Sequence, residues 1–119
     1  MRKTIKLKID NHEFAVKLAQ NAATAALVDR LRQGDVVVQA HGYGSFEQVG
    51  DLGFSLPTDD APIATKPGDL MLYQGNQVTL FYGSNSWSYT KLGEIANTTQ
   101  AELKNILGEG DAVMVLSLE

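Results

Sequence analysis

Alternation of apolar and polar residues with a period of two constrains this chain more than any other feature. From residue 4 to residue 18 only Asp10-Asn11 interrupts the alternation. Successive side chains of a strand point to opposite faces, so this period is typical of strands with one buried face. Two such runs around a two-residue turn predict a β-hairpin. The basic start, MRKTIKLKID, shares the alternation, so we interpret it as a strand and not as a signal peptide, which needs a continuous apolar stretch.

Further strands are expected where apolar, β-branched and aromatic residues gather. The segments are Asp35–Ala40, Leu70–Tyr73, Val78–Tyr82, Trp87–Leu92 and Ala112–Leu118. The three consecutive valines of Asp35–Ala40 favour a strand that is buried on both faces. Gly75-Asn76 is a turn signature and predicts a second hairpin.

The segment from residue 41 to residue 67 is irregular and rich in glycine and proline. We expect short strands in it near Phe46–Val49 and Leu52–Leu56. Long loops inside a compact domain are often functional, so this segment is the first place to look for a site.

Two segments have the period of a helix. Apolar residues between Asn21 and Gln33 recur at three- and four-residue steps, with Asn21 placed as an N-cap. Thr99-Gln100-Ala101-Glu102 is a capping box that opens a second, short helix. About eight strands with two helices predict a mainly β, closed barrel, which also removes exposed sheet edges. We interpret residues 1–119 as a single domain.

Composition excludes several classes of function. The 119 residues carry a formal net charge of −4, which disfavours nucleic acid as a partner because phosphate binding needs a basic surface. No apolar run approaches the roughly 20 residues that span a bilayer, so we expect no membrane helix. The absence of cysteine excludes disulfides and thiolate chemistry, and it suits a cytoplasmic location.

Several strings, in this order, resemble the cyclophilin-like fold. They are NAATAALVDRL, FEQVGDLGFSLP, KPGDLMLYQGNQVTLFYG and SNSWSYTKLGEI. Pro67-Gly68-Asp69, the aromatic strand and Leu92-Gly93-Glu94-Ile95 follow one another as they do in the small bacterial and archaeal branch of that fold. The resemblance covers nearly the whole chain. It implies a closed barrel with two helices and raises peptidyl-prolyl isomerisation as an activity to consider.

The resemblance also identifies a stretch for comparison with the isomerases, which use an arginine in a Phe-His-Arg string. The corresponding residues here are Phe46, Glu47 and Gln48, so the histidine and the arginine are both replaced. The Gln-Gly-Gly string of the isomerase groove is missing as well. An arginine assists by donating hydrogen bonds around a prolyl amide whose rotation barrier is about 18–20 kcal/mol. Gln48 could donate one hydrogen bond but carries no positive charge.

The remaining polar residues give weak signals for catalysis or metal binding. His41 precedes a glycine-rich turn, with Glu47 and Asp51 beyond it, and these three could supply an acid–base pair. The other histidine, His12, has the parity of an apolar strand face. Two histidines in distant strands make a poor metal signal, and Ser84 has no nucleophile motif around it. We therefore predict no catalytic residue, no metal and no cofactor.

The aromatic residues of the second hairpin and the next strand are the most informative cluster. Tyr82, Trp87 and Tyr89 flank the polar loop that contains Ser84 and Asn85. Two interpretations are open: the rings fill the barrel, or they line a cleft with apolar walls and a few polar groups, as ligand sites commonly do. Trp87 follows the loop directly, so a position at the rim of the barrel is expected.

The hypothesis that we take forward is a non-isomerase binding module for a small molecule or a peptide segment. Its candidate ligand-binding residues are Phe46, Glu47, Gln48, Tyr82, Ser84, Asn85, Trp87 and Tyr89. A weak isomerase is the alternative, and an enzyme that uses His41, Glu47 and Asp51 is a third possibility. The sequence leaves the ligand and the oligomeric state open.

Overall fold

The computed structural model describes residues 4–44, 47–95, 98–107 and 110–118, and within them it has nine strands and two helices. In chain order they are β1 (Thr4–Ile9), β2 (His12–Leu18), α1 (Ala22–Leu31), β3 (Val36–Tyr43), β4 (Glu47–Asp51), β5 (Ala61–Ala64), β6 (Asp69–Tyr73), β7 (Gln77–Phe81), β8 (Ser86–Ile95), α2 (Gln100–Leu107) and β9 (Ala112–Ser117). Both predicted helices and both predicted hairpins are present. The predicted mainly β fold is therefore confirmed.

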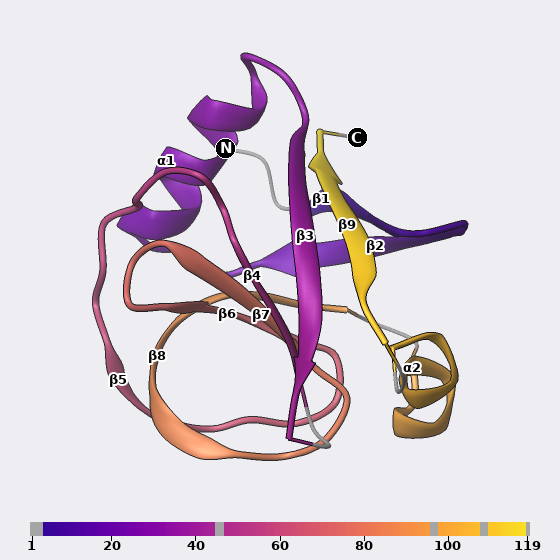
Figure 1. The fold of residues 1–119 in the computed structure, drawn as a ribbon. Helices are drawn as coiled ribbons and strands as arrows, with labels where there is room; N and C mark the ends of the chain where they lie inside the picture. The colour runs from indigo at the N-terminus through magenta and orange to yellow at the C-terminus, as the bar shows by residue number, and fades with distance from the viewer. Residues whose placement is uncertain (1–3, 45–46, 96–97, 108–109, 119) are drawn as a thin grey trace.

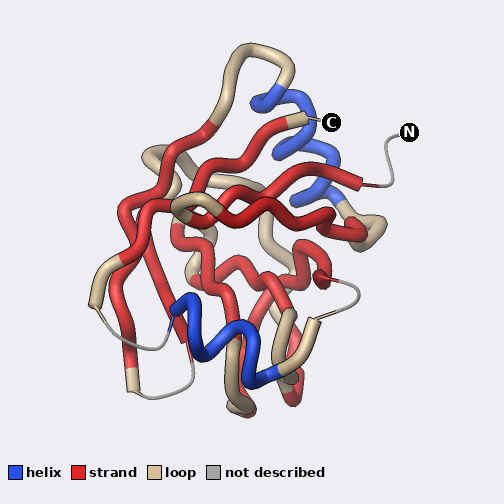
Figure 2. Tube along the Cα trace, turned by 90° about the vertical axis from the view of Figure 1, so that its right-hand side faces the viewer, coloured by secondary structure: helices blue, strands red, loops and turns tan. Residues whose placement is uncertain are grey.

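Eight of the described strands form a closed antiparallel barrel (Figures 1 and 2). The strand order is β2-β1-β9-β3-β4-β7-β6-β8, and pairing of β2 with β8 closes the ring. At that seam Leu18 pairs with Gly93, where a Cβ would lie 2.5 Å from the Lys17 carbonyl oxygen. Only a glycine lets the two strands approach so closely.

Strand β5 lies outside this ring. It pairs with the first half of β8, residues Ser86 to Tyr89, whereas the second half of β8 pairs with β6. The register of β8 against β6 shifts between Leu70 and Met71. This irregularity lies within the segment of β8 that belongs to the barrel, because β8 residues on both sides of it pair with β6.

The two helices lie at opposite ends of the barrel (Figures 1 and 2). Asn21 caps α1, since its side-chain oxygen accepts a hydrogen bond from the Thr24 amide at 2.9 Å. Thr99 performs the same task for α2, accepting from the Glu102 amide at 3.2 Å. Both helices bury leucines in the main core, among them Leu27 from α1 and Leu103 from α2.

Alternate residues of β6 and β7 face two separate apolar clusters. Leu70, Leu72 and Leu80 belong to the main core, which fills the barrel and extends under the helices. Met71 and Phe81 face the other way, into a smaller group that we call the outer cluster. The outer cluster consists of Met71, Phe81 and Tyr89, with Ile63 and Tyr73 packed against it. The outer side of these strands is therefore partly covered as well.

Three details differ from the expectations. Val37 is 54% exposed, so β3 is buried on one face only: its outer face carries no covering layer at that point. Residues 52–56 form no strand, although the Leu52 and Leu56 amides donate hydrogen bonds to the turn between β6 and β7. Strand β5 was not predicted, because its sequence, APIA, has neither alternation nor strong β-propensity.

Candidate functional site

A hollow of about 580 Å³ lies on the outer side of the barrel, beside the outer cluster. We call it the outer hollow, and its lining residues are His41, Tyr43, Glu47, Val49, Tyr73, Gln77, Asn85, Trp87 and Tyr89. They come from β3, β4, β6, β7, β8 and the loop before β8. Strand pairing brings several of them together, since Tyr43 pairs with Glu47, His41 with Val49 and Tyr73 with Gln77.

Glu47 is the most unusual residue of the outer hollow. It is only 6% exposed, yet it is an acidic residue in a lining of mostly aromatic and neutral side chains. Among the described residues none forms a hydrogen bond or ion pair with its carboxyl group. Burial raises the pKa of Glu47 from 4.5 to about 7, because desolvation disfavours the charged form. Buried carboxyl groups of this kind gather at functional sites.

Tyr89 forms the base of the aromatic wall. Its ring meets Phe81 edge-on at 5.4 Å between centroids and lies 6.0 Å from the Tyr73 ring. The Asn85 side-chain amide donates a hydrogen bond to the Tyr89 hydroxyl at 2.9 Å. Burial raises the pKa of Tyr89, and the charge of Glu47 contributes in the same direction. The wall is thus packed and held before any ligand arrives.

Trp87 stands at the rim, as its place after the polar loop led us to expect. It is 60% exposed, and Tyr43, which lines the same hollow, is 62% exposed. Trp87 also lines a second hollow of about 470 Å³, which we call the edge hollow, together with residues of β5 such as Pro62 and Ile63. The two hollows meet at this one indole ring.

The other candidate residues lie elsewhere. Tyr82 is buried in the main core, so for this ring the barrel-filling interpretation holds. Gln48 is 1% exposed, and its amide donates to the carbonyl oxygens of Leu107 at 2.7 Å and Gly110 at 3.0 Å, away from the outer hollow. Ser84 is exposed and does not line the outer hollow. Phe46 lies outside the described residues.

Four lining residues, Tyr43, Val49, Tyr73 and Gln77, were not among the candidates. Val49 has the parity of Glu47 on β4, and Tyr43 faces Glu47 across the β3–β4 pair. The register of these strands is the signal that identifies them. It could not be read from the sequence, because β4 lies in the irregular segment and its pairing with β3 and β7 depends on the tertiary fold.

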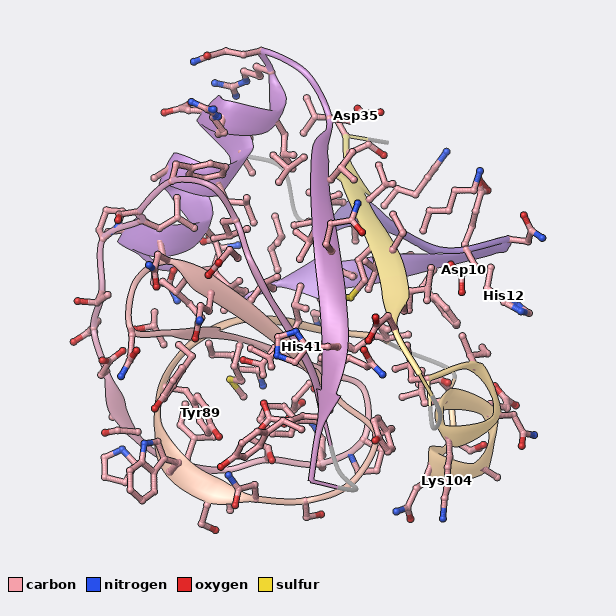
Figure 3. All side chains as sticks on the ribbon, viewed as in Figure 1. Asp10, His12, Asp35, His41, Tyr89 and Lys104 are labelled. Carbon is pink, nitrogen blue, oxygen red and sulfur yellow. The ribbon has the colours of Figure 1, made fainter. Side chains whose placement is uncertain are left out.

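The residues considered for acid–base or metal chemistry separate in the structure. His41 lines the outer hollow with Glu47, whereas the Asp51 carboxylate accepts a hydrogen bond from Gln77 at 3.3 Å and is not part of the lining. His12 is exposed at the tip of the β1–β2 hairpin, away from His41 on β3 (Figure 3), and not on an apolar face. Within the described ranges no three acidic or histidine side chains gather to hold a metal ion.

Two comparisons place the chain among known proteins. No curated protein matches it. A hypothetical protein from Archaeoglobus fulgidus, with a structure determined in solution, has the same fold with a TM-score of 0.72 and 15% sequence identity, over 98% of this chain and 95% of that one. In the described part of the chain no helix is long and apolar enough to cross a membrane. The sequence model of the cyclophilin-like family matches residues 7–119. The chain therefore belongs to the cyclophilin-like family.

Proposed function

We propose that this protein is a binding module that takes a small molecule or a peptide segment in the outer hollow. The observation that carries the proposal is the hollow itself: about 580 Å³, walled by Tyr73, Trp87 and Tyr89, with few polar groups. Ligand sites commonly combine this volume with apolar aromatic walls and a small number of polar groups. The packed aromatic wall lowers the entropy that a ligand would otherwise have to spend in ordering it.

The ligand that fits this surface is elongated. The outer hollow and the edge hollow share Trp87, so a chain that fills one can continue across the indole into the other. Exposed aromatic rings at such positions are frequent hot spots of binding, because they bury a large apolar area with few rotatable bonds. A peptide segment or an extended organic molecule meets this description.

Isomerisation of prolyl bonds is the alternative, and three observations disfavour it. The side-chain amide of Gln48 is occupied by the Leu107 and Gly110 carbonyl oxygens, so its hydrogen bond is not offered to a ligand. Glu47, on the neighbouring position, is an acid and has no hydrogen to donate when ionised. Among the described residues that line the outer hollow there is no arginine or lysine.

Protein-detected NMR with a fragment library tests the binding proposal. We expect shifts of backbone amides to concentrate at residues of the outer hollow, such as Tyr43, Asn85 and Tyr89, and to vanish in the Trp87→Ala variant. Val37→Ala is the matched control, because Val37 is an exposed apolar residue that lines neither hollow. Shifts scattered over the surface, or unaffected by Trp87→Ala, would refute the proposal.

A second assay separates the alternative. We expect no acceleration of prolyl isomerisation in a proline-containing tetrapeptide above the uncatalysed rate. Turnover that is lost on replacement of Glu47 or Tyr89 would favour the isomerase instead.

A further inference from the structure

Glu47, a buried acid, sets the outer hollow apart from a merely apolar pocket. Glu47 is 6% exposed and lines the hollow, and the described residues offer its carboxyl group neither a hydrogen bond nor an ion pair. Burial of an unpaired carboxylate is costly, and in folded proteins such groups are normally paired. A ligand that brought a positive charge would remove this cost.

The walls of the hollow suit the same kind of ligand. Tyr73, Trp87 and Tyr89 present aromatic rings, and the negative face of an aromatic ring attracts organic cations. The described residues of the lining include no lysine or arginine that would compete for Glu47 or attract an anion. The Asn85 amide, a donor that could serve an anion, already donates to the Tyr89 hydroxyl.

We propose that the outer hollow is a receptor for an organic cation, a primary ammonium group that pairs with the Glu47 carboxylate and lies against the aromatic wall. This rests on the binding function proposed above and names its ligand class. The ammonium group donates hydrogen bonds to the carboxylate, and the carbon skeleton that bears it occupies the space under Trp87. The edge hollow then receives the rest of an elongated ligand.

Ionisation of Glu47, among the titratable groups beside it, determines how binding depends on pH. Among the described residues, the titratable groups that line the hollow with Glu47 are His41 and Tyr43 on β3, Tyr73 on β6 and Tyr89 on β8, whereas Asp51 on β4 lies outside the lining. The ligand selects the ionised form of Glu47, and burial holds the pKa of that group at about 7 in the free protein. Binding of an ammonium ion therefore strengthens as pH rises from 6 to 8, and at pH 6 it releases a proton.

Two probes of equal shape test this proposal: 2-phenylethylamine, which is an ammonium ion at these pH values, and neutral 2-phenylethanol. Titration of Trp87 fluorescence gives both affinities, since Trp87 is the one tryptophan of the sequence and lines the hollow. At pH 8 we expect the ammonium ion to bind at least tenfold more tightly than the alcohol. Calorimetry at pH 6 in phosphate and in MES, two buffers without a primary amine that differ in their enthalpy of ionisation, should show proton release for the ammonium ion alone.

Three variants assign the preference to one group. Glu47→Gln keeps the shape of the side chain and should abolish both the preference and the proton release. Asp51→Asn and Glu13→Gln should retain the preference, because neither side chain lines the outer hollow. Thermal unfolding and an amide NMR spectrum verify that each variant is folded.

The outcomes separate the two proposals. Equal affinities of the two probes at the outer hollow, or a preference that survives Glu47→Gln, would overturn the cation receptor while the binding function stands. Binding of neither probe would overturn the cation receptor. Together with a fragment screen that finds no ligand at the hollow, it would overturn the binding function too.

Discussion

The interior and the outer side of the barrel are built by the same strands but from different residues. On β6, Leu70 and Leu72 enter an interior dominated by aliphatic side chains, whereas Met71 and Tyr73 face the aromatic outer cluster. The interior is closed by two helices and a complete ring of strands, so it is packed for stability. The outer cluster borders an open hollow of about 580 Å³. One face of each strand thus maintains the fold while the other is available for binding.

Gln48 and Glu47, two neighbouring residues of β4, show the same difference between the two sides of the barrel, here with polar side chains. The amide of Gln48 binds two carbonyl oxygens near the end of α2 and fixes that region to the barrel. Glu47, one residue earlier, turns to the outer hollow and is left without a partner among the described residues. The two hydrogen bonds that Gln48 donates support the fold, although its side-chain oxygen is buried without a partner among the described residues. A buried polar group that is left unsatisfied costs stability.

Truncation of an interior leucine should have the largest effect on stability. Leu72→Ala removes a fully buried side chain from the main core and should lower the free energy of unfolding by about 2–5 kcal/mol. Tyr73→Ala is the matched variant on the next residue, where the side chain is half-buried beside the outer hollow. Urea denaturation measures both. Equal losses of the free energy of unfolding in the two variants would mean that the interior and the outer side of the barrel contribute alike to stability.

Gln48→Ala should have the next largest effect. It leaves the carbonyl oxygens of Leu107 and Gly110 without their donor, and an unsatisfied buried group costs about 1–3 kcal/mol. Because Gln48 does not line the outer hollow, the affinity for 2-phenylethylamine should be unchanged. A variant with full stability and weakened binding would show that Gln48 serves the site and not the fold.

Unlike the two side chains above, which stabilise the fold, the ionised side chain of Glu47 should lower the free energy of unfolding. This effect should appear only above about pH 4.5. Its pKa is about 7 in the folded protein against 4.5 as a reference for the unfolded chain, so between these values the folded state binds more protons. The free energy of unfolding therefore falls as pH rises from 4.5 to 7. Since water reaches the hollow, we expect the change to be reduced by solvent to about 1 kcal/mol.

Urea denaturation at several pH values measures this contribution. In Glu47→Gln the fall should be missing, and above pH 7 the variant should be more stable than the wild type. Glu13→Gln, at an exposed glutamate, is the control and should keep the fall. If the wild-type free energy of unfolding rose over this range, and the rise were missing in Glu47→Gln, the effect that we assign to burial of Glu47 would be contradicted.

More of the fold than of the candidate site could be predicted from the sequence. Period-two alternation identified the β1–β2 hairpin, and the Asn21 and Thr99 caps identified both helices, because these signals are local. The site depends on which strands pair: Tyr43 reaches Glu47 only through the β3–β4 register. Tyr82 and Trp87 were equally plausible as lining, and their different burial follows from the curvature and pairing of the barrel.

Trp87→Ala should have the smallest effect on stability and a clear effect on binding. The indole is 60% exposed, so its removal leaves little cavity, and the free energy of unfolding should change by less than about 1 kcal/mol. A tryptophan in a packed core would cost about 3–5 kcal/mol instead. Binding of 2-phenylethylamine, followed by calorimetry because the fluorophore is gone, should weaken by more than about 1 kcal/mol, as for a hot spot. Val37→Ala, at a residue of β3 that is 54% exposed, should change neither quantity by a comparable amount. A large loss of stability in Trp87→Ala would mean that this ring holds β5 and β8 together, and that the outer side belongs to the fold as much as the interior does.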